Sequence, residues 1–211
     1  MNNIIIGVDV GSTKSGLCVV IDYRIKEGVV IPNNQVIGYI GKFTENNNVL
    51  IVLEDIVSYD GKVNRDVLNT VKFIGELTYR ISNELRVKYE TIERWEVKKW
   101  AFDNYSSICI PEIEKNIVRL SNHAIRFNQL HKDDKKTIKR KTYLTADGSY
   151  FKPSFAYVGD RILVKVLKEH WAIEEQKKFT KNKYGLESHS WQGLSTLTAY
   201  IELRGNRLDI K

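Results

Sequence analysis

The stretch IIIGVDVGSTKSG, residues 4–16, combines an apolar strand, a turn and the beginning of a second strand. Residues 11–13, Gly-Ser-Thr, are typical of a turn, and residues 16–22 continue as a second apolar strand. A single acid, Asp9, interrupts the apolar residues of the first strand. Two strands joined by a short polar turn predict an antiparallel pair at the start of the chain.

Predicted strands and helices alternate along the rest of the chain. We expect further strands at 35–41, 49–53 and 89–93, and helices at 65–88, 97–102, 158–171 and 190–203. The run VLIVL at 49–53 is apolar throughout, which is typical of a strand covered on both faces. In the helix at 65–88 the apolar residues recur every three or four positions. The pattern predicts an α/β fold with a central mixed sheet flanked by helices.

Length and composition indicate one ordinary globular domain. The chain has 211 residues, of which 42% are hydrophobic, 28% charged and 10% aromatic, so it is neither wholly disordered nor fibrous. We expect a single domain over 1–211 with a basic insertion around 104–152. Its two cysteines, Cys18 and Cys109, lack the spacing of a zinc site. The absence of a signal-peptide pattern and of a long apolar run predicts an intracellular, cytoplasmic protein outside the membrane.

Positive charge is concentrated outside the first 60 residues. The net charge is +7, and the densest block, 115–141, holds nine Lys and Arg residues against Asp133 and Asp134. One interpretation is a solvated helical insertion. The other is an arm that contacts phosphates, because a basic tract of this kind attracts polyanions.

Two acids lie where apolar residues are expected. Asp9 lies within the first strand, and Glu54 follows the run at 49–53 directly. A buried carboxylate costs several kcal/mol unless it is paired or bound to a metal. Two such acids on adjacent central strands would converge, and hard cations such as Mg²⁺ take oxygen ligands of this kind. The alternative is that Glu54 is solvated at the end of its strand or pairs with an arginine.

These motifs together resemble the RuvC-type Holliday-junction resolvases, most closely their phage-type members, in the ribonuclease H-like superfamily. The resemblance extends over most of the chain. It rests on GVDVGS at 7–12 with Gly16, Glu54 after its buried strand, NTVKFIGE at 69–76, VKK at 97–99 and SHSWQGL at 188–194. It implies a ribonuclease H-like fold in which Asp9 and Glu54 are the first-strand and fourth-strand acids.

The resemblance also implies an active site with two divalent cations, Mg²⁺ or Mn²⁺, that cleave a phosphodiester. Asp9 would bridge the ions, with Glu54 on one and His189 with Glu187 on the other. The family usually has two acids three residues apart on its last helix, whereas the matching positions here are His189 and Gln192. Asp160 is a further candidate for the missing carboxylate.

The implied substrate is branched DNA, most simply a four-way junction cleaved by paired symmetric nicks in a homodimer. The resemblance implies DNA contacts by Lys98 and Lys99, and the charge of the basic tract adds Lys135, Lys136, Lys139 and Arg140 as candidates. The helix at 65–88 would form the dimer interface, although its apolar stripe could equally belong to the core. Three alternatives stay open. They are an actin-like or Hsp70-like ATPase fragment that uses GVDVGSTKSG as a phosphate-binding hairpin, another ribonuclease H-like nuclease, and a non-catalytic DNA-binding protein.

Overall fold

A five-stranded mixed sheet forms the centre of the computed structural model, which describes residues 2–55, 64–116, 154–173 and 184–204. The strands are β1 (Asn3–Asp9), β2 (Lys14–Ile21), β3 (Arg24–Pro32), β4 (Asn48–Asp55) and β5 (Lys88–Glu93), in the order β3-β2-β1-β4-β5. β2 runs opposite to the other four strands: it pairs antiparallel with β1 and with β3, whereas β4 pairs parallel with β1 and with β5. This arrangement confirms the predicted α/β, ribonuclease H-like fold.

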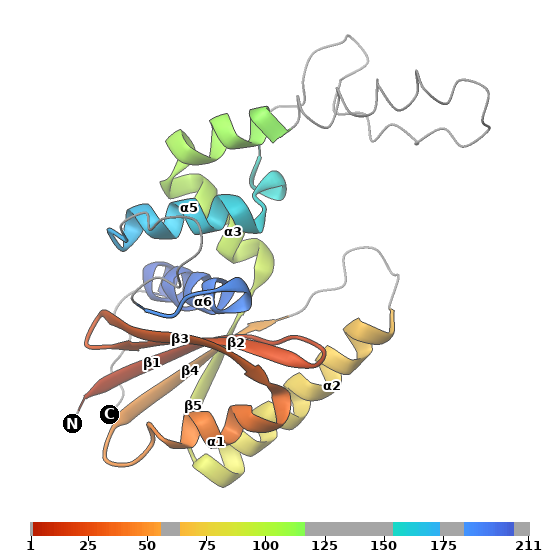
Figure 1. The fold of residues 1–211 in the computed structure, drawn as a ribbon, viewed down its shortest axis with the longest axis vertical. Coiled ribbons are helices and arrows are strands. Elements are labelled where there is room, and N and C mark those ends of the chain that lie inside the picture. The colour runs from red at the N-terminus through yellow and green to blue at the C-terminus, as the bar shows by residue number, and fades with distance from the viewer. Residues whose placement is uncertain (1, 56–63, 117–153, 174–183, 205–211) are drawn as a thin grey trace, which may run out of the picture.

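Helices cover both faces of the sheet (Figure 1). On one face lie α1 (Val36–Gly41) and α2 (Arg65–Arg80). On the other lie α3 (Arg94–Asn104), α5 (Asp160–His170) and α6 (Ser188–Arg204), with α6 directly on the strands. A further helical stretch covers 106–116, and short turns of 3-10 helix occur at η1 (Asn33–Gln35) and η3 (Phe155–Tyr157). α3 and α5 pack on α6, and α5 lies farther from the strands than α6 does.

The alternation of side chains along β1 divides the core into two clusters. Ile4, Ile6 and Val8 pack toward α1 and α2, whereas Ile5 packs with the apolar residues of α5 and α6. Successive residues of a strand point to opposite faces, so a strand between two helical layers needs apolar residues at nearly every position. Gly7 lies on the α6 face, where an added Cβ would lie 2.0 Å from the carbonyl oxygen of Gly193. The helix therefore rests on the backbone of the sheet.

The predicted strand at 35–41 is wrong, because this segment is η1 followed by α1. Its buried residues are Val36, Ile37 and Ile40, a helical spacing that a count of apolar residues does not distinguish from a strand. The third strand is β3, which follows β2 through a two-residue turn at Asp22 and Tyr23. Both have positive φ, 46° and 61°, as in the tight turns that match the twist of a hairpin.

The predicted helix at 65–88 begins as expected and ends earlier. Asn64 caps it by accepting the Val67 backbone N–H at 2.9 Å. α2 ends at Arg80, and one π-helical turn, η2 (Ile81–Leu85), leads to Arg86, whose φ is 54°. Leu77 belongs to the core, so the apolar stripe is in part core packing. The face away from the sheet exposes Leu68, Val71 and Tyr79.

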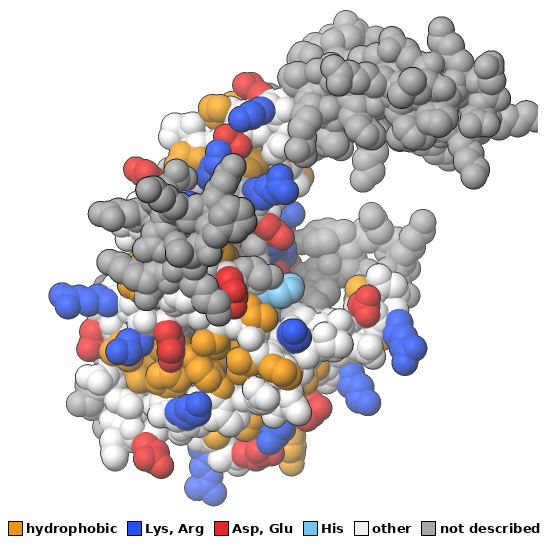
Figure 2. Space-filling view, viewed as in Figure 1, with side chains coloured by type: hydrophobic (Ala, Val, Ile, Leu, Met, Phe, Trp, Pro, Cys, Tyr) orange, Lys and Arg blue, Asp and Glu red, His pale blue; other side chains and the backbone are white. Residues whose placement is uncertain are grey.

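Charge is mixed on the described part of the surface. On the face in Figure 2, Lys and Arg side chains alternate with Asp and Glu and do not gather into one basic patch. Most of the predicted basic insertion lies outside the described residues. Among the helices that the structure describes, none is long and apolar enough to cross a membrane.

Candidate active site

Two largely buried carboxylates lie side by side where β1 and β4 end. Val8 pairs with Leu53 in the parallel register, so Asp9 and Glu54 occupy the next positions on neighbouring strands. Both side chains project toward the α6 face, and they are only 16% and 12% exposed. The register thus brings together the two acids that the sequence singles out.

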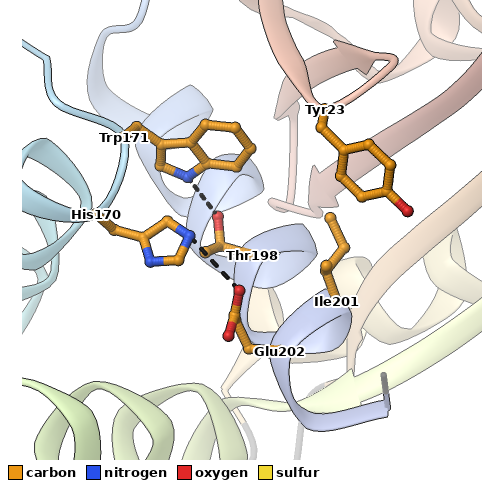
Figure 3. Close-up of a pocket in the computed structure, with 6 residues that line it drawn as sticks. All are labelled: Tyr23, His170, Trp171, Thr198, Ile201 and Glu202. Carbon is orange, nitrogen blue, oxygen red and sulfur yellow. Dashed lines mark hydrogen bonds and ion pairs between the residues drawn. The ribbon is translucent and has the colours of Figure 1, made fainter. Parts of the chain in front are cut away.

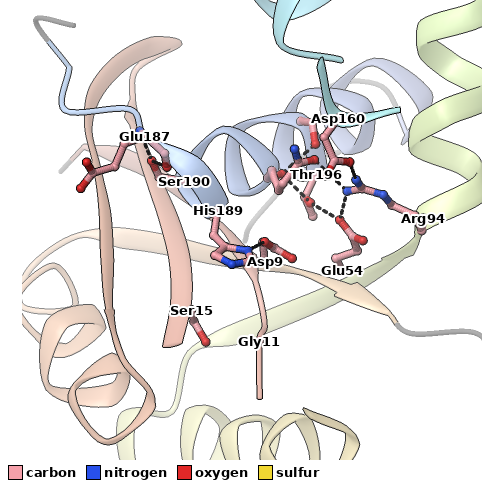
Figure 4. A network of polar contacts seen from close by, with 12 residues as sticks. Asp9, Gly11, Ser15, Glu54, Arg94, Asp160, Glu187, His189, Ser190 and Thr196 are labelled. Carbon is pink, nitrogen blue, oxygen red and sulfur yellow. Dashed lines mark hydrogen bonds and ion pairs between the residues drawn. The ribbon is translucent and has the colours of Figure 1, made fainter. Parts of the chain in front are cut away.

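The first turn of α6 places His189 against Asp9. The two groups are hydrogen-bonded, with 2.6 Å between His189 Nδ1 and Asp9 Oδ2 (Figure 4). The His189 side chain remains half exposed. Gly16 on β2 allows this approach, because a Cβ there would lie 2.1 Å from the backbone carbonyl carbon of His189. The glycine at the start of the hairpin therefore positions the histidine.

An arginine holds the other side of the site together. Arg94, the first residue of α3, donates from Nη1 to Glu54 Oε2 and to Gln192 Oε1, at 2.8 Å each. Its Nη2 donates to Asp160 Oδ1 at the start of α5. The Thr196 hydroxyl lies 3.3 Å from Glu54 Oε2 and donates to it. Figure 4 shows Glu54, Arg94, Thr196 and Asp160 as one group beside the Asp9–His189 pair.

Burial dominates the electrostatics of the two acids. It raises the pKa of Asp9 above the ordinary value, and the hydrogen bond and charge of His189 offset only part of this effect. Burial likewise raises the pKa of Glu54, against the opposing charge of Arg94. For Arg94, burial acts to lower the pKa, but Glu54 and Asp160 raise it overall. The two carboxylates are therefore costly to keep ionised without a cation next to them.

The chemistry of these donors fits a hard divalent cation. Carboxylate oxygens of Asp9 and Glu54 are preferred ligands for Mg²⁺ or Mn²⁺, and a neutral imidazole such as His189 can complete the set. Among the described residues, no three His, Cys, Asp or Glu side chains already surround a common point. His189 is bonded to Asp9 Oδ2 and Arg94 to Glu54 Oε2, so an ion at Asp9 would compete with the contact from His189.

Other residues predicted for the site lie farther out or outside the described ranges. The Glu187 carboxylate points away from Asp9 and Glu54 in Figure 4, and its backbone N–H bonds the Ser190 hydroxyl at 2.7 Å. Lys98 is half-buried on α3, where burial and the charge of Arg94 lower its pKa. Lys99 is exposed and pairs with Asp103. Lys135, Lys136, Lys139 and Arg140 lie outside the described residues.

Arg94 and Thr196 are missing from the prediction. One signal could have indicated Arg94: it directly follows a strand that pairs parallel with β4. Parallel strands end at the same edge of a sheet, so a charged residue after β5 belongs near Glu54. The sequence suggests an arginine partner for Glu54 as an alternative but does not identify the arginine.

A separate pocket lies toward the other end of α6 (Figure 3). In it, Trp171 Nε1 donates to Thr198 Oγ1 at 2.9 Å, and His170 Nε2 is 3.8 Å from Glu202 Oε1. Its lining residues are Tyr23, His170, Trp171, Thr198, Ile201 and Glu202. None of them belongs to the group around Asp9 and Glu54, so this pocket is not the candidate active site.

Comparison with known proteins finds similar folds among solved structures. Thermus thermophilus RuvC in complex with a Holliday junction substrate superposes with a TM-score of 0.49 at 13% identity, over 95% of each chain. A second structure of RuvC from Thermus thermophilus gives a TM-score of 0.48 at 12% identity, over 95% of this chain and 96% of that one. No protein-family model and no curated protein matches the sequence. At these values the similarity assigns no activity, which must come from the side chains of the site.

The raised pKa of Asp9 predicts how stability depends on pH in EDTA. Between the unfolded-state and folded-state pKa values the folded chain binds more protons, so the free energy of unfolding falls as pH rises through this window. The Asp9→Asn variant has no carboxyl group to titrate at this position. We expect the variant to be more stable than the wild type at pH 7, with the difference shrinking toward pH 4. Urea unfolding in EDTA across this range measures it, and an Asp9→Asn variant less stable at pH 7 would contradict the prediction.

Proposed function

We propose that the protein is a divalent-metal-dependent endonuclease that cleaves branched DNA, most simply a four-way junction. The observation that carries the proposal is the pair of largely buried carboxylates, Asp9 and Glu54, on adjacent strand ends with His189 bonded to one of them. A core position is a costly place for two acids, and a cation between them is the arrangement that offsets the cost.

In this proposal the three side chains have distinct roles. Asp9 and Glu54 would hold the metal, which when bound activates water and stabilises the leaving oxygen of a phosphodiester. His189 is half exposed at the edge of the site and can carry a proton to or from the reacting oxygens. Lys98 lies close enough to Arg94 and Glu54 to add positive charge where a phosphate would approach.

Two features favour branched DNA over a linear duplex as the substrate: the symmetry of a four-way junction and the positive charge of the protein. A four-way junction has two-fold symmetry, and paired nicks need two sites, which a homodimer supplies. The exposed apolar residues of α2, Leu68, Val71 and Tyr79, offer a surface for the second copy. The basic block at 115–141 would contact the arms through phosphates.

A substrate panel tests the proposed function. The full chain is incubated with a synthetic four-way junction, a linear duplex of the same sequence and an RNA–DNA hybrid, each with Mg²⁺, Mn²⁺ or EDTA. Paired nicks in the junction alone, dependent on the ion, are the expected result. Cleavage of the hybrid alone would point to a ribonuclease H, and no cleavage of any of the three substrates with either ion would overturn the nuclease assignment.

The role of His189 is tested by comparing three variants. His189→Ala should lower the cleavage rate by about 10²–10⁴-fold, the range for loss of a general acid or base. Glu187→Gln should have a smaller effect, because that carboxylate points away from Asp9. Single-turnover cleavage of a junction measures the rates, with Asp160→Asn alongside and circular dichroism to confirm folding. Near-normal His189→Ala beside an inactive Glu187→Gln or Asp160→Asn would identify that acid as the third functional group.

A further inference from the structure

Three oxygen acceptors from three different elements converge on the guanidinium of Arg94. They are Glu54 Oε2 on β4, Gln192 Oε1 on α6 and Asp160 Oδ1 at the start of α5. The Arg94 side chain is only 20% exposed. Its place beside the buried acids is therefore fixed by the packing of all three elements.

The same acceptors are the kind of ligands that a divalent cation takes. Carboxylate oxygens and an amide oxygen suit Mg²⁺ and Mn²⁺. Here a guanidinium takes the central position, and it satisfies them with directed, charge-assisted hydrogen bonds. Gln192 fits this arrangement, because its neutral amide accepts from Arg94 without adding negative charge.

The charge of the site agrees with a single divalent ion. Asp9, Glu54 and Asp160 contribute three negative charges and Arg94 one positive charge, which leaves −2 when His189 is neutral. One divalent ion balances this charge, whereas two would leave an excess of +2 in a partly buried place. Lys98 is near enough for its charge to interact with those of Glu54 and Asp160. Its positive charge makes the binding of a second divalent ion still less favourable.

We propose that Arg94 is a resident cation that takes the place of a second divalent ion, so that the site binds one ion, at Asp9. This inference rests on the proposed function, because it presumes that the Asp9 side of the site binds metal. It departs from the two-ion arrangement that the sequence resemblance implies. Arg94 supplies a fixed positive charge at Glu54 Oε2, and the one exchangeable ion binds Asp9 together with the other carboxylate oxygen of Glu54.

The test counts bound Mn²⁺ per chain in the absence of DNA. Electron paramagnetic resonance of free Mn²⁺ during titration of the full chain gives the stoichiometry without any use of activity. Arg94→Met removes the charge and keeps much of the side-chain volume, and Arg94→Lys is the matched control that keeps the charge. Arg94→Gln replaces Arg94→Met if circular dichroism shows that the latter does not fold.

We expect one Mn²⁺ in the wild type and in Arg94→Lys, and two in Arg94→Met. Adding Asp160→Asn to Arg94→Met should return the count to one, because it removes a ligand of the second ion. Two ions in the wild type, or one in Arg94→Met, would overturn the role of Arg94 and leave the metal site intact. No bound ion in the wild type would instead contradict the metal site itself, and with it the proposed function.

Discussion

Replacing Asp9 with Asn is expected to slow cleavage of a four-way junction by about 10³-fold or more, since a metal supplies several kcal/mol of transition-state stabilisation. Asn keeps the size of the side chain and removes its charge, so the ion loses its principal ligand. Binding of the junction should persist, because phosphate contacts by basic residues do not depend on this carboxylate. Single-turnover cleavage and a gel-shift titration with the same DNA measure the two effects separately.

A matched control is available at the opposite end of the sheet. Asp22 is exposed in the β2–β3 turn, where its carboxylate accepts the Asn3 backbone N–H at 3.2 Å. Asp22→Asn makes the same chemical change, retains the acceptor and tolerates the positive φ. It should cleave at the wild-type rate. If Asp9→Asn cleaves at a comparable rate to this control, Asp9 holds no catalytic metal.

Gly7→Ala is expected to destabilise the fold by about 3 kcal/mol or more, at the upper end of the cost of overpacking a core. Its Cβ would lie 2.0 Å from the Gly193 carbonyl oxygen and 2.9 Å from Leu197 Cβ, so α6 would have to move off the sheet. With a denaturant slope of roughly 1–3 kcal/mol per M, the urea midpoint should fall by about 1 M or more. The same movement would carry His189 away from Asp9.

Gly75→Ala provides the control for this substitution. Gly75 is within α2, and an added Cβ there meets nothing within 4 Å. Alanine in a helix interior is favoured over glycine by roughly 0.5–1 kcal/mol, so this variant should gain stability. Equal urea midpoints for the two variants would show that α6 does not rest on the backbone of β1 as described.

Asp9 and Glu54 could be predicted because each breaks an apolar run, a pattern visible within a few residues. Their meeting followed from one further inference, that both strands are central, which the parallel register of β1 and β4 confirms. The segment 35–41 could not be assigned in the same way. A short apolar run is compatible with a strand and with a helix. Only the structure distinguishes the two here, because Val36, Ile37 and Ile40 are buried with a helical spacing.

The arginine network depends on contacts that no local pattern contains. Arg94 lies 40 residues from Glu54, 66 from Asp160 and 98 from Gln192 along the chain. Its position results from the packing of α3 and α5 against α6, which lies on the sheet. His189 and Asp9 are 180 residues apart, and only the family resemblance predicted that they lie in the same site. Local pattern thus identified the acids, and tertiary packing supplied their partners.

The most direct test of the metal site is a crystal of the protein soaked in Mn²⁺ and measured for anomalous scattering. We expect a peak in contact with carboxylate oxygens of Asp9 and Glu54, absent from crystals of Asp9→Asn treated in the same way. A junction-cleaving protein whose Mn²⁺-soaked crystals show no peak at these two residues would contradict it.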